Sequence, residues 1–174
     1  IASAIRWRIG RSSSSVARIA SSDCQALVVM HQTLREMPGP RAEMTAIAAH
    51  WDPATDKLLL VNCGHVSPVV VRGDGGVDPF DFGPGHGLGG RAAPKPAQRS
   101  TSLATGDRLV LVSDGVVQSG EGQAGLRFEG VIRAVVGAER ATAAETVREI
   151  HRAVLAASDG DLRDDATAVC LAVT

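Results

Sequence analysis

Short apolar runs separated by turn residues predict about six strands along this chain. Two are expected over Glu43–Trp51 and Lys57–Cys63, and the DPATD segment between them is typical of a hairpin turn. A third strand is expected over Pro68–Arg72, ending at the tight turn GDGG. The VDPFDF segment is a candidate fourth strand, and Pro79 marks it as an edge strand because proline cannot donate to a sheet.

Further strands are predicted in the second half of the chain, after the long loop GPGHGLGGRAAPKPAQ. The segment RSTSLATGDRLVLVSDG predicts strand, turn and strand, with Gly106 and Asp107 in the turn. The chain ends with DDATAVCLAVT, whose apolar end predicts a central strand. Most neighbouring strands are joined by short turns, which favours largely antiparallel sheets.

Three stretches have helical periodicity. Residues 16–37 place apolar side chains on one face, and MPGP ends this helix. EGVIRAVVG predicts a short helix, and TAAETVREIHRAVLAAS predicts a longer one that begins with a capping box of Thr142 and Glu145. Helices beside antiparallel sheets indicate an α+β fold in layers. The predicted apolar faces are Ile19, Leu27, Met30 and Leu34 in the first helix, and Ala144, Val147, Ile150, Val154 and Leu155 in the last.

The composition is that of an ordinary globular protein. Of 174 residues, 44% are hydrophobic and 21% charged, enough for one domain with a sizeable core. The net charge of −1 provides no field that would recruit nucleic acid or a membrane surface. Three cysteines without a Cys-x-x-Cys pair favour reduced thiols and a cytoplasmic location. We find no apolar run long enough for a membrane span and no signal peptide.

The first 22 residues differ from the rest. They contain four arginines, a run of four serines and no acidic residue. This composition predicts a disordered arm. A nucleic-acid-binding arm is the alternative, weakened by the lack of interleaved aromatic residues, and steep salt dependence of binding would be its signature.

Carboxylates flank two of the predicted strands. Asp114 follows the strand RLVLV and precedes Gly115, while Asp164 and Asp165 precede the last strand. If these strands pair, the carboxylates converge at one end of a sheet, where oxygen ligands favour Mg²⁺ or Mn²⁺ over Zn²⁺. The alternative is structural, because Asp-Gly is a common turn and Asp often flanks strands.

Other motifs carry less information. The glycine pattern in GPGHGLGG is not a nucleotide site, since the prolines that follow forbid the helix that such a site needs; we expect a mobile loop. His65 follows a strand in NCGHVSP, and a lone histidine is more often a structural or surface residue than a ligand. We interpret Met44 and Trp51 as core residues.

Several segments in order resemble one family. MTAIAAHWDPATDKLLLVNCGHVSPVVVR, then TGDRLVLVSDGVVQ, then DDATAVCLAV look like the C-terminal two-thirds of a metal-dependent protein serine/threonine phosphatase. The resemblance is to the PPM family (type 2C-like), in its bacterial SpoIIE-like branch. We therefore expect residues 1–22 to be an atypical segment and residues 23–174 to be the phosphatase domain.

The resemblance implies an αββα four-layer sandwich, two mainly antiparallel sheets flanked by helices, with its N-terminal part incomplete here. It implies a pair of Mn²⁺ or Mg²⁺ ions whose bound water attacks a phosphoserine or phosphothreonine, without a catalytic nucleophile from the protein. By match to the motifs, Asp114 and Asp164 are metal ligands. Gly115, Asp165 and His65 are candidates for a supporting role around them. The implied partner is a phosphorylated signalling protein such as an anti-anti-sigma factor, with a sensor domain upstream.

The sequence departs from the family pattern at its start. The family carries metal ligands in a Gly-Asp-x-x-Asp element and in a following Asp-x-x-Gly-x-Gly turn, and no Asp precedes Asp23 here. Two matched aspartates cannot bridge two divalent cations. Three explanations stay open: a fragment of a longer enzyme, a rearranged N-terminus, or a domain that kept the fold and lost catalysis.

Two main function hypotheses follow: a phosphatase domain, or a catalytically inactive regulatory module of the same fold that binds a signalling protein. An upstream Gly-Asp-x-x-Asp element would favour the first. Missing N-terminal strands would leave sheet edges open, which predicts marginal stability or self-association. A sharp, concentration-independent melting transition of a monomer would contradict that expectation.

Overall fold

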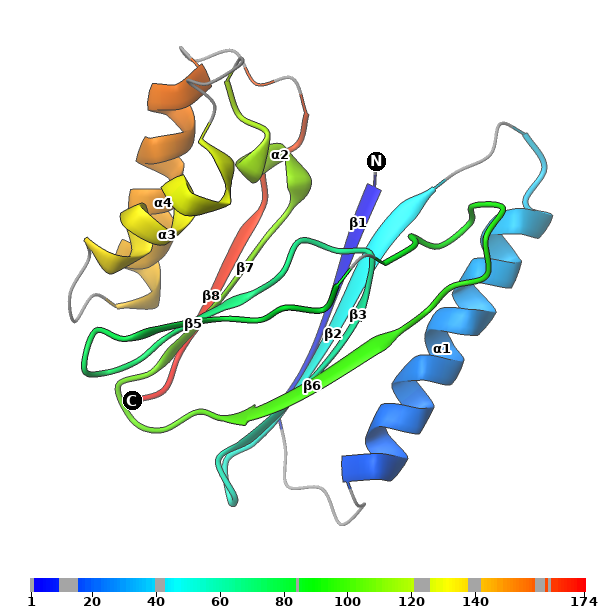
Figure 1. The fold of residues 1–174 in the computed structure, drawn as a ribbon, viewed down its shortest axis with the longest axis horizontal. Helices are drawn as coiled ribbons and strands as arrows, with labels where there is room; N and C mark the ends of the chain where they lie inside the picture. Colours follow the sequence, from blue (N-terminus) through cyan, green and yellow to red (C-terminus); the bar gives the residue numbers. More distant parts are fainter. Residues whose placement is uncertain are drawn as a thin grey trace. The chain divides into compact units, whose positions relative to one another are not determined.

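The computed structural model divides the chain into two compact units, each with its own four-stranded sheet, and we describe each unit by itself (Figure 1). Unit 1 contains residues 1–65 and 81–103, and unit 2 contains residues 66–80 and 104–174. None of the helices in the described part combines the length and the apolar character that a membrane crossing needs. The structure describes residues 2–9, 16–39, 43–83, 85–120, 126–137, 142–158, 162 and 164–174.

Unit 1 is a sheet of strand order β1-β2-β3-β6, with helix α1 running alongside it (Figure 1). β2 and β3 form the expected hairpin around the DPATD turn, and β3 pairs antiparallel with β6. β1 pairs parallel with β2, because the intervening α1 provides the crossover that a parallel connection requires. The elements are β1 (Ala2–Ile9), α1 (Val16–Glu36), β2 (Met44–Asp52), β3 (Lys57–Cys63) and β6 (Ala97–Ser102).

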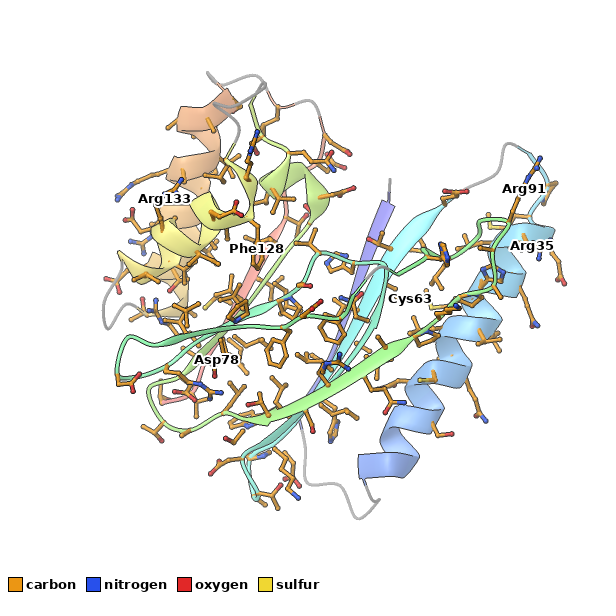
Figure 2. The ribbon with its side chains drawn as sticks, viewed as in Figure 1. Arg35, Cys63, Asp78, Arg91, Phe128 and Arg133 are labelled. Atoms are coloured by element: carbon orange, nitrogen blue, oxygen red, sulfur yellow. The ribbon has the colours of Figure 1, made fainter. Side chains whose placement is uncertain are left out.

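One face of this sheet packs on α1. Leu27 is buried against the strands, and Met30 and Leu34 pack beside it, as the helical periodicity predicts. Ile19 lies outside the residues whose side chains the structure describes. Because strand side chains alternate, the strands contribute every second residue to this cluster. They are Ala46 and Ala48 of β2 and Leu59, Val61 and Cys63 of β3, with Cys63 labelled in Figure 2.

Unit 2 is a sheet of strand order β5-β4-β7-β8, all pairs antiparallel, with α3 and α4 packed together on one side (Figure 1). β5 contains Pro79 and lies at the sheet edge, as expected. The strands are β4 (Val69–Val71), β5 (Val77–Pro79), β7 (Arg108–Val112) and β8 (Ala168–Ala172); the helices are α2 (Asp114–Val117), α3 (Arg127–Val136) and α4 (Ala143–Ser158).

The predicted capping box starts α4. The backbone N–H of Thr142 donates to the Glu145 carboxylate at 2.8 Å, and the Glu145 N–H donates to the Thr142 hydroxyl at 3.3 Å. These bonds hold the pKa of Glu145 below its usual range. The buried face of the helix is Thr146, Ile150, Val154 and Ser158, so Ile150 and Val154 were predicted correctly while Ala144 and Leu155 are exposed.

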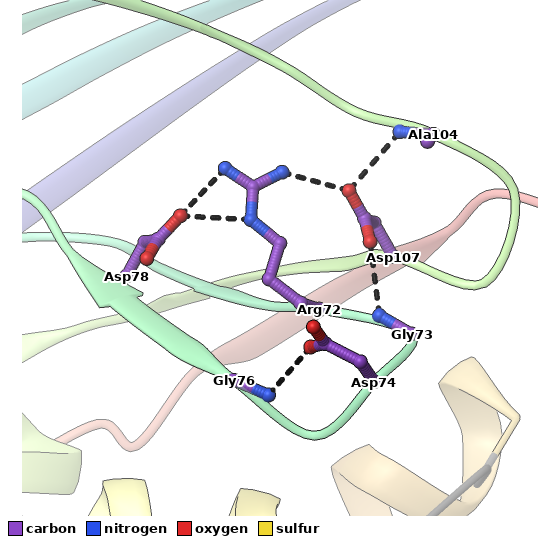
Figure 3. A network of polar contacts seen from close by, with 7 residues as sticks. All are labelled: Arg72, Gly73, Asp74, Gly76, Asp78, Ala104 and Asp107. Carbon is purple, nitrogen blue, oxygen red and sulfur yellow. Dashed lines mark hydrogen bonds and ion pairs between the residues drawn. The ribbon is translucent and has the colours of Figure 1, made fainter.

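An arginine between two carboxylates ties the β4–β5 turn to the start of β7 (Figure 3). Arg72 donates from Nη1 to Asp107 at 2.7 Å and from Nε to Asp78 at 2.7 Å. Asp107 also accepts from the N–H groups of Gly73 and Ala104, each at 3.0 Å. The Asp107 carboxylate therefore fixes both the β4–β5 turn and the turn before β7.

Two strands have neighbours that the sequence does not report. The strand, turn and strand predicted over RSTSLATGDRLVLVSDG are present as β6, a turn and β7, but the two strands belong to different sheets and do not pair. The last strand, predicted to be central, is the edge strand β8 of its sheet in the described part of the chain, and Val169 on it is 36% exposed. Apolar composition reports burial but not which neighbours a strand has.

The N-terminal arm and the glycine-rich loop both contribute residues to regular or buried structure. Within residues 1–22, β1 pairs with β2 from Met44 to Trp51 and α1 begins at Val16, so this segment is not simply a disordered arm. The loop after β5 is anchored by Leu88, which is fully buried and exchanges backbone hydrogen bonds of 2.7 and 3.1 Å with Met44. Its prolines exclude a helix, and Leu88 packs in the core of unit 1 while most of the other described loop residues are exposed, so its mobility stays a prediction.

Candidate active site

Asp114 stands where the buried strand β7 ends. All five residues of β7 are buried, and Ser113 then adopts an extended conformation (φ −76°, ψ 167°) as the N-cap of the one-turn helix α2. Asp114 is the first residue of that helix and is half-buried. The strand therefore delivers a carboxylate to the end of the sheet.

The DDAT segment lies at the same end. β8 pairs antiparallel with β7, and Val112 stands opposite Ala168. Asp114 follows the end of β7, and Asp164 and Asp165 precede the start of β8, so both motifs leave the sheet together. This pairing meets the condition under which the sequence places the carboxylates at one end of a sheet.

The Ser113 side chain fastens the two motifs together. Its buried hydroxyl donates to the Asp165 carbonyl at 3.0 Å and accepts from the Thr167 N–H at 2.9 Å. The Ser113 N–H donates to the Thr167 carbonyl at 2.9 Å. Three hydrogen bonds thus continue the β7–β8 contact past the last residue pair of the strands.

Gly115 is required by the close passage of the DDAT backbone. A Cβ at this position would lie 2.4 Å from the Asp165 carbonyl oxygen, closer than real Cβ atoms approach. The Ser119 hydroxyl donates to the Gly115 carbonyl at 2.7 Å and fixes the turn from the other side. The missing side chain therefore permits the two carboxylate-bearing loops to touch.

Two of the three carboxylates accept a hydrogen bond from the N–H of the next residue. Asp114 accepts from the Gly115 N–H at 3.2 Å, and Asp164 accepts from the Asp165 N–H at 2.9 Å. Asp164 and Asp165 are exposed. In the part of the chain that the structure describes, no three Asp, Glu, His or Cys side chains group closely enough to hold a metal ion.

His65 belongs to unit 1 and is held by an asparagine. The Asn62 side chain accepts from the His65 N–H at 2.8 Å and donates to its carbonyl at 3.0 Å. The His65 Nδ1 lies 2.9 Å from the Thr45 hydroxyl, and the residue is 6% exposed. Gly64 between them has φ +69° and approaches the Gly87 backbone too closely for a Cβ. The structure thus explains the spacing of the NCGH motif within its own unit.

Residues 10–174 match the family of stage II sporulation protein E (SpoIIE). The chain belongs to this family. It is a PPM-type serine/threonine phosphatase domain by descent, which confirms the resemblance drawn from the ordered motifs. Among curated proteins, none matches the sequence significantly.

Solved structures agree on the fold. The phosphatase domain of the cell fate determinant SpoIIE from Bacillus subtilis superposes with a TM-score of 0.66 at 15% identity, over 93% of this chain and 75% of that one. The SiaA-PP2C domain of Pseudomonas aeruginosa gives 0.72 at 17% identity, over 91% and 68%. The RsbU and RsbW domains of Rv1364c from Mycobacterium tuberculosis give 0.65 at 16% identity, over 91% and 42%. At these identities the similarity shows the α+β fold with two mainly antiparallel sheets.

The donor set in this SpoIIE-family chain suits Mn²⁺ or Mg²⁺ in kind but not in number. Carboxylate oxygens are the ligands that these hard cations prefer, and each cation takes about six of them or waters. Asp114, Asp164 and Asp165 supply carboxylates at one end of a sheet but do not form a group of three. The described residues therefore do not make a complete metal site.

Sequence reasoning missed the residues that hold the candidate motifs in place. Ser113 and Asn62 carry no charge and stand in motifs where Asp114 and His65 drew attention. The available signal was their place at the ends of buried strands, where a polar side chain needs a partner. For Ser113 that partner is 52 residues away, which no local pattern reports.

Proposed function

We propose that this chain is the larger part of a metal-dependent phosphatase domain that removes phosphate from phosphoserine or phosphothreonine of a signalling protein in the cytoplasm. Membership of the SpoIIE family and the superposition on solved phosphatase domains support this interpretation. In the proposal, the two sheets and their helices form the αββα sandwich of the family, with residues 23–174 as its C-terminal part.

The junction of the two motifs is the observation that carries the proposal. Ser113 and Gly115 bring the Asp114 turn and the DDAT loop into contact, so both carboxylates leave the same end of the sheet. Asp114 and Asp164 would hold Mn²⁺ or Mg²⁺, while Asp165 and His65 would have supporting roles. Such cations lower the pKa of water, neutralise phosphate charge and orient both reactants. The role of the protein residues would be to bind the cations and to orient them and the phosphate.

The remaining ligands would come from a Gly-Asp-x-x-Asp element in a segment upstream of Ile1. The proposal therefore predicts that the chain by itself binds Mn²⁺ weakly and that the element restores a full site. An anti-anti-sigma factor is the substrate that the family resemblance implies. The similarity to a Mycobacterium tuberculosis structure that contains RsbU and RsbW domains supports this choice.

The test is Mn²⁺-dependent hydrolysis of a phosphoserine peptide by this chain and by a version extended upstream to include the element. Asp114→Asn removes one candidate ligand with little change in shape. Asp74→Asn is the matched control, because Asp74 is an exposed turn residue whose amide form still accepts from the Gly76 N–H. We expect activity in the extended protein that Asp114→Asn abolishes and Asp74→Asn preserves. Equal activity in both variants would contradict the role of Asp114.

A catalytically inactive module is the second candidate, favoured by the incomplete donor group in the described residues. It would bind a phosphorylated anti-anti-sigma factor without hydrolysing it. Binding that is unchanged by Asp114→Asn and by chelation, with no hydrolysis in the extended protein, would favour this candidate over the phosphatase.

A further inference from the structure

Unit 2 contains a pocket of about 620 Å³ at the end of its sheet where β7 begins. This volume is in the range of small-molecule sites. Its walls come from the end of β4, the start of β7, the end of β8, the end of α3 and the start of α4. Among the lining residues are Val71, Arg108, Val136, Thr142 and Ala172.

The strand register directs Arg108 into the layer between the sheet and the helices. Val110 and Val112, two and four residues further along β7, both belong to the core cluster on that side. The Arg108 guanidinium donates from Nη1 to the Thr146 hydroxyl of α4 at 2.6 Å, and the residue is only 5% exposed. Burial raises the pKa of the Cys170 thiol on β8, and the nearby charge of Arg108 opposes that rise.

Arg108 is a buried cation that has no counterion among the described residues. In that part of the chain, no carboxylate lies within ion-pair distance of its guanidinium. Its acceptor on α4 is a neutral hydroxyl, although a guanidinium carries five N–H groups. A buried charge is costly unless it is paired. By contrast, Arg72 in the same unit has two carboxylate partners.

The other charged groups near the pocket are already engaged. Asp74 accepts from the Gly76 N–H at 2.9 Å. Glu145 caps α4 through Thr142, and Arg72 is neutralised by Asp78 and Asp107. Of the described residues that line the pocket, Arg108 is therefore the positive charge without a carboxylate partner, while Asp74 and Thr174 also line the pocket.

We propose that this pocket binds a small organic oxyanion, with its carboxylate or phosphate head on Arg108 and an apolar body along Val71, Val136 and Ala172. The planar guanidinium fork matches both head groups. Arg108 begins β7 and Asp114 follows its other end, so the site is separate from the candidate active site and does not rest on the proposed function.

Calorimetric titration of the full chain with octanoate and with octyl phosphate tests the proposal and distinguishes the two heads. Octanamide, which has the same body without the charge, is the ligand control. We expect the anion to bind about tenfold or more tightly than the amide, because hydrogen bonds to a charged group are worth about 1.5–3 kcal/mol. Backbone amide NMR shifts on binding should concentrate at Gly73, Gly106 and Thr142.

Two variants separate the charge from the cavity. Arg108→Met keeps the size of the side chain and removes its charge, and Arg152→Gln removes a charge from the exposed face of α4 as the control. Val136→Phe fills the pocket and leaves Arg108 intact, so it tests whether the ligand occupies this pocket even if Arg108→Met does not fold. We expect weaker binding for Arg108→Met and Val136→Phe and unchanged binding for Arg152→Gln. The proposal is overturned if neither anion binds the folded protein, if octanamide binds equally, or if Val136→Phe has no effect.

Discussion

The Ser113 hydroxyl donates to the carbonyl of Asp165 at 3.0 Å, joining the end of one strand to the loop before another. The same oxygen accepts from the Thr167 N–H at 2.9 Å. Replacing Ser113 by alanine leaves two backbone groups without this partner, and a lost hydrogen bond in a buried place costs about 1–3 kcal/mol. We therefore expect Ser113→Ala to lower the free energy of unfolding by about that amount.

Urea denaturation followed by circular dichroism measures the effect of Ser113→Ala. Ser100→Ala on the exposed part of β6 is the control and should change stability by less than about 0.5 kcal/mol. Equal stability of the two variants would show that Ser113 does not fasten the DDAT loop.

Gly115→Ala should displace that loop. The new Cβ would lie 2.4 Å from the Asp165 carbonyl oxygen, and backbone cannot yield as a flexible side chain can. Overpacking of this kind costs about 1–3 kcal/mol. Amide shifts in an NMR spectrum should move at Asp165 and Thr167. Gly90→Ala is the control, since its Cβ would meet only the Glu43 side chain, and spectra in which Gly115→Ala leaves Asp165 unmoved would contradict the prediction.

The parts of the fold that local patterns decide could be predicted from the sequence. The β2–β3 hairpin follows from alternating residues around DPATD, and the start of α4 follows from the spacing of Thr142 and Glu145. The pairing of β6 and β7 could not be predicted in this way. Leu103 bonds to Asp56 after β6, while Gly106 bonds to Val173 before β7, so the short segment between them changes sheets. Only long-range contacts decide that change.

In the candidate site, too, local patterns predict some features while others depend on long-range contacts. The motifs indicate which carboxylates are candidates, and the β7–β8 pairing meets the condition under which they leave the same end of the sheet. The hydroxyl of Ser113 and the amide of Asn62 hold these motifs through contacts that charge and periodicity do not report. Whether Asp114 and Asp164 bind metal stays a prediction.

Leu88→Ala tests whether the glycine-rich loop is anchored. Leu88 is fully buried beside the α1 face of the first sheet, and removing a buried leucine side chain costs about 2–5 kcal/mol. Hydrogen exchange at the amides of Met44 and Leu88, which bond to each other's carbonyls, should become faster in the variant. Leu155→Ala on the exposed face of α4 is the control. Rapid exchange of the Leu88 amide in the unmodified protein would instead support a mobile loop.

The ion pair of Arg72 and Asp107 should make stability depend on acid. Burial alone would raise the pKa of Asp107, but hydrogen bonds from Ala104, Arg72 and Gly73 outweigh it and hold that pKa below the ordinary value of 3.8. A carboxyl whose pKa is depressed in the folded state stabilises the protein above its unfolded pKa. That contribution is lost as the pH falls below about 4 and through the folded pKa.

Two variants distinguish the contribution to stability of the buried partner of Arg72 from that of its exposed partner. Asp107, with a side chain 7% exposed, is the inner partner of Arg72, and Asp78, 56% exposed, is the outer one. Asp107→Asn should lower the free energy of unfolding at neutral pH by about 1–3 kcal/mol, because a hydrogen-bonded charged group is lost while Arg72 keeps Asp78 as a partner. Asp78→Asn should cost less than about 1 kcal/mol, as expected for an exposed pair.

Urea denaturation from pH 7 to pH 2 measures both effects. We expect the acid-induced loss of stability to be smaller in Asp107→Asn than in the unmodified protein, because the group whose protonation causes it is absent. Asp78→Asn should keep nearly all of the acid dependence. If Asp107→Asn retained the full dependence, other carboxyls would have to be responsible for it, and the assignment to the Arg72 network would be wrong.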